Sequence, residues 1–261
     1  MDSQDSKFEE SLRAKVEGMM PIGGMDQDER TDIVEKNMRF LRPFHTGPKE
    51  PTPEEIAAQI ERKKQEIAAD RLRALRKEGF PERAIRAAQN ATGPGALKAS
   101  QLIPHVTGDG DGLLLLLGPT GRGKTVMATL LAMARQEQEL WPGMFRTAFS
   151  MFSEIKSTYG GNKKRRSPFG ETTTVTEEDL VSEWSFTAFL IIDEVQTRSG
   201  TTWEDGLFDE IVIARYGELL PTVLIANFTL EEAQANLGPR IMDRARESGG
   251  IVNCNWESYR K

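Results

Sequence analysis

Short apolar runs alternate with amphipathic stretches along the later two thirds of the chain. The runs predict strands at 113–117, 144–148, 188–192, 222–226 and 251–255. The stretches between them predict helices at 124–139, 149–158, 176–183, 204–219, 229–236 and 239–247. Strands separated by helices in this way favour an α/β fold, in which helices cover both faces of a mostly parallel sheet.

Residues before Gly93 follow another pattern, with few aromatic residues and no strand signal. Short helices are predicted near 12–20 and 28–41. A capping box in TPEE, formed by Thr52 and Glu55, then opens a helix that runs to about Lys77. Its apolar stripe is narrow and consists of Ile56, Ile60, Ile67 and Ala74; its cations include Arg62, Lys63, Lys64, Arg71, Arg73, Arg76 and Lys77. Two interpretations stay open, a partner-binding or linker helix and a solvated helix lying against the next domain.

These patterns divide the chain into three parts: an N-terminal segment (1–50), a linker helix with its connection (51–92) and an α/β domain (93–261). The first part is too thin to bury much apolar surface alone, so we expect a partner to order it.

Composition narrows the class of protein. The 261 residues carry a net charge of −6, so any contact with nucleic acid requires a local basic patch. The single cysteine, Cys254, excludes an internal disulfide and a zinc ribbon built from cysteine pairs. No apolar stretch approaches the roughly 20 residues of a membrane span, and the polar, acidic start is unlike a signal peptide. We expect a cytoplasmic protein.

The stretch GPTGRGKT matches the phosphate-binding pattern G-x-x-x-x-G-K-[ST] between a predicted strand and a predicted helix. Its glycines let backbone N–H groups wrap phosphates, and the helix start adds the positive end of its dipole. The predicted nucleotide-binding residues are Gly118, Pro119, Thr120, Gly121, Arg122, Gly123, Lys124, Thr125 and Val126. The pattern indicates a nucleoside triphosphate as ligand, with Thr125 as a ligand of Mg²⁺.

Acids follow a second buried strand, in FLIIDEV. Asp193 is predicted to lie beside the Mg²⁺ ion, and Glu194 to orient an attacking water. The next strand ends in Asn227, which either senses the terminal phosphate or merely begins a turn.

Phosphoryl transfer is strongly assisted by an arginine, often supplied by a neighbouring molecule. LGPRIMDRARESGG offers Arg240, Arg244 and Arg246. We predict that Arg244 acts across a subunit interface, supported by Arg240 on the same helix face. The alternative is that these arginines form only surface salt bridges.

Together these motifs resemble the DnaC/IstB-like AAA+ ATPases, and most closely the DnaC-type loaders of bacterial replicative helicases. LGPRIMDRARESGGIVNCNWESYR and FSMFSEIKSTYGG are similar to that family. The resemblance implies an AAA+ P-loop core without a C-terminal lid domain, ATP with Mg²⁺, and self-association into a spiral or ring. It also implies that an N-terminal region binds a replicative helicase hexamer and that the inner face of the oligomer binds single-stranded DNA.

The predicted DNA contacts come from three segments. Lys156 and Tyr159 lie in the helix that resembles the family's initiator-specific helix, where a cation and a stacking aromatic suit a single strand. Ser199 and Trp203 follow the acids of the second motif. Lys163 and Lys164 open a run of cations in an insertion at 160–174, which is otherwise interpreted as a solvated loop.

The leading functional interpretation is an ATP-controlled loader of the replicative helicase onto single-stranded DNA. One alternative is an IstB-like transposition helper that binds duplex DNA and recruits a transposase. Another is a helicase-binding inhibitor in which ATP hydrolysis has little role.

Overall fold

The computed structural model describes Glu10, Arg13, Ala14, Asp28 and residues 31–36, 52–107, 112–161, 163–166, 170–248 and 250–258. The chain forms two compact units, Met1–Lys64 and Gln65–Lys261. In the first unit residues 31–36 are helical, whereas most of the helices expected near 12–20 and 28–41 lies outside the described residues. The three-part division of the chain stays a prediction.

Helix α3 (Pro53–Lys77) begins as the sequence predicts. The backbone N–H of Thr52 donates to Glu55 Oε2 (2.7 Å), and the N–H of Glu55 donates to Thr52 Oγ1 (3.2 Å). Ile56, Ile60 and Ile67 are 43%, 51% and 43% exposed, so the apolar stripe lies at the surface of the described chain. Among the described residues, no helix is long and apolar enough to span a lipid bilayer.

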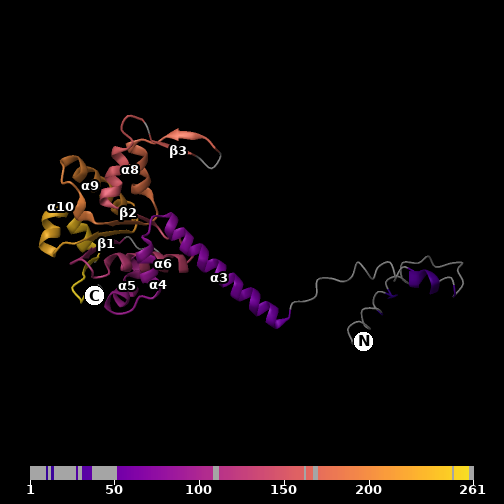
Figure 1. The fold of residues 1–261 in the computed structure, drawn as a ribbon. Coiled ribbons are helices and arrows are strands. Elements are labelled where there is room, and N and C mark those ends of the chain that lie inside the picture. The colour runs from indigo at the N-terminus through magenta and orange to yellow at the C-terminus, as the bar shows by residue number, and fades with distance from the viewer. Residues whose placement is uncertain are drawn as a thin grey trace. The chain divides into compact units, whose positions relative to one another are not determined.

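Five parallel strands form the sheet of the second unit, in the order β2-β5-β6-β1-β7 (Figure 1). The strands are β1 (Leu113–Leu117), β2 (Met144–Thr147), β5 (Leu190–Asp193), β6 (Thr222–Ala226) and β7 (Ile251–Asn253). The prediction of a mostly parallel sheet in an α/β fold is therefore confirmed.

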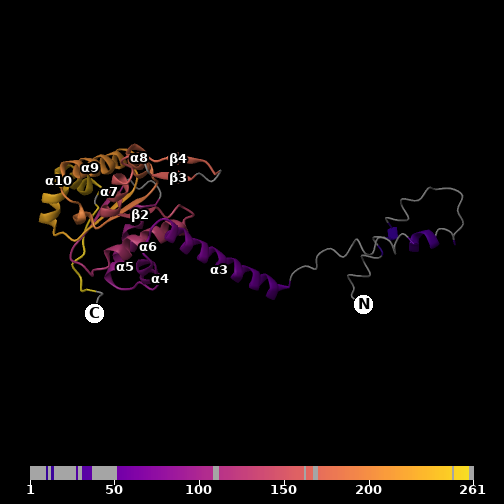
Figure 2. The ribbon, with the colours of Figure 1, turned by 45° about the horizontal axis from the view of Figure 1, so that its top comes forward.

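Successive residues of a strand point to opposite faces, and the leucines of β1 divide accordingly. Leu113 and Leu115 pack with helices α7 (Ala148–Lys156), α8 (Glu177–Phe186), α9 (Thr202–Gly217) and α10 (Leu230–Glu247). Leu114 and Leu116 pack with α4 (Glu82–Gln89), α5 (Pro94–Leu102) and α6 (Lys124–Glu137). Figures 1 and 2 show these two helical layers on either side of the sheet.

Several element ends differ from the prediction for local reasons. Strand β2 stops at Thr147 because that residue caps α7 in a reciprocal pair with Ser150. The break predicted between 236 and 239 is a kink within α10, where Gly238 has φ 71° and ψ 166° before Pro239.

Several of the elements that the structure describes were not predicted. Helices α4 and α5, with the short turn η2 (Ile103–His105), fill the stretch between α3 and β1. Phe80 and Ile85 of this stretch, together with Leu75 at the end of α3, are buried in the core with Leu114, although all three fall in the range expected to be linker. The insertion forms a hairpin of β3 (Lys164–Arg166) and β4 (Thr172–Thr174), which extends beyond α8 in Figure 2.

The buried side chain of Arg215 connects several segments of the core by hydrogen bonds. The guanidinium of Arg215 donates to the carbonyls of Trp184 (2.8 Å), Thr187 (2.7 Å) and Pro221 (2.8 Å) and to Thr222 Oγ1 (2.8 Å). Burial lowers the pKa of Arg215 to about 9, which still leaves it charged at neutral pH. Arg215 thus links the C-terminal part of α8 to the segments before β5 and β6.

Arg215→Ala is expected to destabilise the chain by roughly 3 kcal/mol or more, because several buried carbonyls lose their donor. Urea unfolding followed by circular dichroism measures the change. Arg246→Ala is the control, since Arg246 makes an exposed ion pair with Asp243 (3.0 Å) worth less than about 1 kcal/mol. Equal stability of the two variants would contradict the structural role of Arg215.

Candidate functional site

The loop between β1 and α6 has the backbone of a phosphate cradle. Gly118, Gly121 and Gly123 have φ of 129°, 86° and 79°, a region that side chains disfavour. Gly123 precedes the first residue of α6, Lys124, so the N-terminal end of that helix faces the loop. The motif therefore adopts the strand-loop-helix context that the sequence predicts.

Lys124 closes this loop over the sheet edge. Its ammonium group donates to the carbonyls of Gly118 (2.6 Å) and Pro119 (2.9 Å) and to Asn227 Oδ1 (2.8 Å). Asn227 comes directly after β6, so the predicted lysine and amide meet although they are far apart in sequence. Asn227 also donates its backbone N–H to Gln196 Oε1 (3.1 Å).

The predicted magnesium ligands also meet. Thr125 Oγ1 donates to Asp193 Oδ2 (2.7 Å), and Asp193 is only 8% exposed. Burial raises the pKa of Asp193, because a carboxylate without a cation is costly there. Glu194 beside it is exposed and has a left-handed backbone (φ 54°), with its N–H donating to Asp193 Oδ1 (2.7 Å).

These oxygen groups suit a hard cation such as Mg²⁺, which binds through one or two protein oxygens together with phosphates. In the described part of the chain no cluster of three or more His, Cys, Asp or Glu could hold a metal by itself. The donor set therefore fits a metal that arrives with a nucleotide.

A cavity of about 440 Å³ opens above the loop. Residues 120–126, Asp193, Glu194 and Asn227 line it, and so do Pro81, Arg83, Ala84 and Ala87 at the start of α4. The contribution of α4 was missed, because its sequence carries no motif and falls in the expected linker. Pro81, Ala84 and Ala87 make one end of the cavity apolar, which suits the nucleobase of a nucleotide.

The candidate arginines lie elsewhere. Arg240 and Arg244 are exposed on the second half of α10, and neither lines the cavity within the described residues. Arg244 pairs with Glu247 (3.0 Å), and its guanidinium lies 4.9 Å from the ring centroid of Tyr216. A role for Arg244 in phosphoryl transfer would thus require a neighbouring subunit.

The segment after β7 backs the phosphate loop. The Trp256 indole N–H donates to the Arg122 carbonyl (2.8 Å), and the Arg122 guanidinium donates to the Trp256 carbonyl. The Cys254 N–H donates to the Leu117 carbonyl (2.7 Å), and a Cβ on Gly118 would lie 2.6 Å from the Cys254 carbonyl oxygen. No role was predicted for Trp256, because its contact with the loop joins residues that are far apart in the sequence.

Four predicted DNA-binding residues gather at the end of α7. Lys156 Nζ lies 5.6 Å from the ring centroid of Trp203, and the rings of Trp203 and Tyr159 meet edge to face at 6.2 Å. Tyr159 lies in the turn after α7, and its hydroxyl donates to Glu177 (3.0 Å). Ser199 belongs to the loop that precedes α9.

Glu204 contacts two residues of this group, Lys156 and Ser199, and was not predicted as part of it. Its buried carboxylate accepts from Lys156 Nζ (2.7 Å) and from the Ser199 N–H (2.6 Å). Burial favours the protonated form, but these two donors outweigh it and lower the pKa of Glu204. The charge of Lys156 is therefore balanced by that of Glu204 in this structure.

Phe149, which also belongs to α7, is 66% exposed and was likewise not predicted as part of this group.

The two lysines expected in the insertion have different surroundings. Lys163 is half-buried in an ion pair with Glu154 (2.6 Å), whereas Lys164 is exposed on β3.

Comparisons with known proteins agree with this architecture, although no family model matches the chain. Over 86 residues, 33% of the chain, it is 35% identical to the replicative helicase loader DnaC of Escherichia coli K12. Over 168 residues, 63% of the chain, it is 24% identical to DnaC of Buchnera aphidicola from Acyrthosiphon pisum. The crystal structure of the DnaC helicase loader superposes with a TM-score of 0.54 at 15% identity, covering 66% of this chain and 99% of that one.

Over part of its length, the chain is therefore similar to DnaC-type replicative helicase loaders. The matched stretches span 35% of the length of the Escherichia coli protein and 63% of the Buchnera protein. A DnaI crystal structure shares the fold, with a TM-score of 0.52 at 19% identity over 67% of this chain and 94% of that one. So does a replication initiator DnaA bound to AMPPCP and single-stranded DNA, with a TM-score of 0.51 at 14% identity over 69% and 52% of the chains.

Trp256→Phe is expected to weaken nucleotide binding by up to about 10-fold, because the Arg122 carbonyl of the phosphate loop loses the hydrogen bond from the indole N–H. Titration of a fluorescent ATP analogue measures the effect. Trp141→Phe is the matched control, because the hydrogen bond between Arg135 and Trp141 uses the Trp141 backbone carbonyl and survives the substitution. If the Trp256→Phe variant binds the analogue as tightly as the Trp141→Phe control, the segment after β7 does not support the phosphate loop.

Proposed function

We propose that this chain is an ATP-controlled loader of a replicative DNA helicase onto single-stranded DNA. The observation that carries the proposal is the convergence of the phosphate loop, Asp193 and Asn227 on one cavity, in a chain similar to DnaC loaders. The DnaA relative bound to an ATP analogue and single-stranded DNA supports both ligands for this fold.

At the nucleotide site, Lys124 would bind phosphate oxygens in place of the loop carbonyls it now contacts. Its third partner, Asn227, lies where the amide would report on the terminal phosphate. Glu194 stands exposed at the cavity wall, in position to accept a proton from an attacking water.

Thr125 and Asp193 would hold the Mg²⁺ ion that enters with ATP. When bound, the ion would neutralise charge that develops on the phosphates. Asp193 is held for this task by its bonds from Thr125 and from the Glu194 N–H.

The arginine needed for the transition state would come from a second copy of the chain. Neither Arg240 nor Arg244 of the same chain lines the described cavity, and both stand on an exposed helix face. A single copy would therefore hydrolyse ATP weakly, and a spiral or ring would complete its sites.

Single-stranded DNA would bind across α7 and its C-terminal turn. Phe149 and Tyr159 offer exposed rings for base stacking, and Lys156 offers a cation to the phosphates. A phosphate must compete with Glu204 for Lys156, so this contact would exchange one anion for another. The N-terminal segment, 1–50, would bind the helicase.

The native mass of a mixture with the replicative helicase of the bacterial source tests the loader. With ATP and Mg²⁺ we expect a complex of helicase hexamer and several copies of this chain. Absence of any complex, together with binding to duplex DNA, would instead favour a transposition helper.

Arg244→Ala is expected to lower ATP hydrolysis in the presence of single-stranded DNA by roughly three orders of magnitude, the effect of losing such an arginine. Phosphate release at saturating ATP measures it. Arg246→Ala is the matched control, because both arginines pair at 3.0 Å with an acid three residues away and are 46% and 48% exposed. Hydrolysis at the rate of the control would remove Arg244 from the mechanism.

A further inference from the structure

The β3–β4 hairpin has two chemically different faces. In its antiparallel register Lys164 lies opposite Thr174, Arg166 opposite Thr172, and Arg165 opposite Thr173. Residues directly opposite each other share a face, and neighbours along a strand alternate. Lys164, Arg166, Thr172 and Thr174 therefore form one face, defined here as the outer face, and Arg165 with Thr173 forms the inner face.

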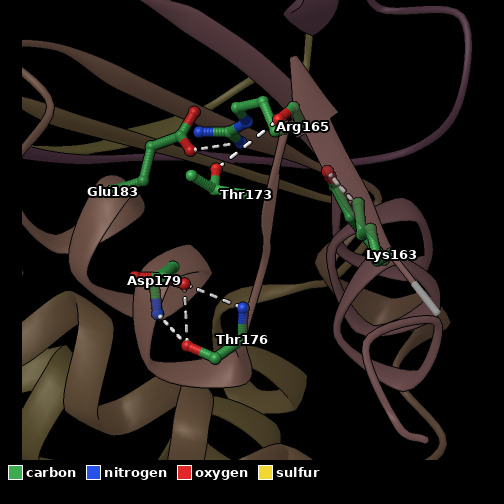
Figure 3. A network of polar contacts seen from close by, with 7 residues as sticks. Lys163, Arg165, Thr173, Thr176, Asp179 and Glu183 are labelled. Atoms are coloured by element: carbon green, nitrogen blue, oxygen red, sulfur yellow. Dashed lines mark hydrogen bonds and ion pairs between the residues drawn. The ribbon is translucent and has the colours of Figure 1, made fainter. Parts of the chain in front are cut away.

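The inner face is anchored to the body of the domain (Figure 3). Arg165 pairs with Glu183 of α8 (2.7 Å), and Thr173 Oγ1 lies 3.5 Å from the Arg165 carbonyl. At the base of the hairpin, Lys163 pairs with Glu154 of α7 (2.6 Å), and its carbonyl accepts from the Val175 N–H (2.9 Å). Two of the four consecutive cations thus serve to fix the hairpin.

The capping pair of α8 strengthens this anchor. Thr176 Oγ1 accepts from the Asp179 N–H (3.1 Å), and the Thr176 N–H donates to Asp179 Oδ2 (2.8 Å). The chain therefore passes directly from β4 into a well-defined helix start, which holds the strand direction.

The outer face presents two cations and two hydroxyls, all exposed. Within the part of the chain that the structure describes, neither Lys164 nor Arg166 forms an ion pair. The neighbouring acid Glu171 lies outside β4. Lys, Arg and Thr side chains are those that proteins use for phosphate oxygens. The face carries no apolar side chain of the kind that the core of a protein interface requires.

We propose that the outer face binds the phosphate backbone of the single strand that α7 holds. This assignment rests on the proposed function. The hairpin leaves the C-terminal turn of α7, and the Lys163–Glu154 pair fixes its base to α7 itself. The outer face therefore adds positive charge next to α7, and among the described residues its two cations, unlike Lys156, pair with no acid that a phosphate would have to displace.

The test is binding of a fluorescently labelled oligothymidylate to the full chain over a range of salt concentrations. For Lys164→Ala/Arg166→Ala we expect affinity lower by on the order of 10-fold and a salt slope smaller by about 1.4, which is roughly 0.7 for each lost phosphate contact. Lys164→Gln/Arg166→Gln should behave in the same way, and thermal unfolding checks that both variants fold.

Arg62→Ala/Lys64→Ala is the matched control, because it also removes one arginine and one lysine two residues apart, from exposed positions on α3. The control should retain the wild-type slope. Lys156→Ala serves as the reference for the α7 contact.

Three results would overturn the assignment. If Lys156→Ala weakens binding but the hairpin variant does not, the outer face is no DNA contact and the proposed function stands. If the hairpin variant binds DNA normally but loses the helicase complex, the face binds protein instead. If the wild-type chain binds no single strand, the proposed function fails and this assignment fails with it.

Discussion

The parallel pairing of β6 with β1 and with β5 is the constraint on which the candidate nucleotide site depends. Leu117 pairs with Ala226, and Ile192 pairs with Leu224, so the carboxyl ends of all three strands reach the same edge. Parallel strands carry their loops on that edge, where ligands of open α/β sheets bind. The bonds from Lys124 to Asn227 and from Thr125 to Asp193 then join the three strand ends directly.

One short segment belongs to both candidate sites. The turn η3 (Val195–Thr197) and the following loop begin at Glu194, and Gln196 there accepts from the Asn227 N–H. A few residues later the Ser199 N–H donates to Glu204, which also holds Lys156. The same segment therefore contacts the Asn227 backbone N–H through the Gln196 side chain and the Glu204 carboxylate through the Ser199 N–H.

The parts that could be predicted from the sequence are those encoded locally. An apolar run followed by Gly118–Thr125, or by Asp193, carries its strand, loop and ligand type in consecutive residues. Glu204 could not be predicted, because it occupies the first turn of α9, where an exposed acid is ordinary, and only tertiary packing buries it. Arg215 was missed for the same reason. Two of the four cations at 163–166 anchor the hairpin and two belong to its outer face. This division likewise depends on the hairpin register, which the sequence pattern does not specify.

Gly118 illustrates how closely folding and ligand chemistry overlap here. The backbone at Gly118 has φ 129°, and a side chain there would collide with the Cys254 carbonyl at the end of the sheet, before any nucleotide is considered. A loss of ATP binding on substitution of Gly118 is thus ambiguous, because the edge strand would be displaced as well. An inactive Gly118 variant would therefore report on the packing of the phosphate loop against the edge strand as much as on phosphate recognition.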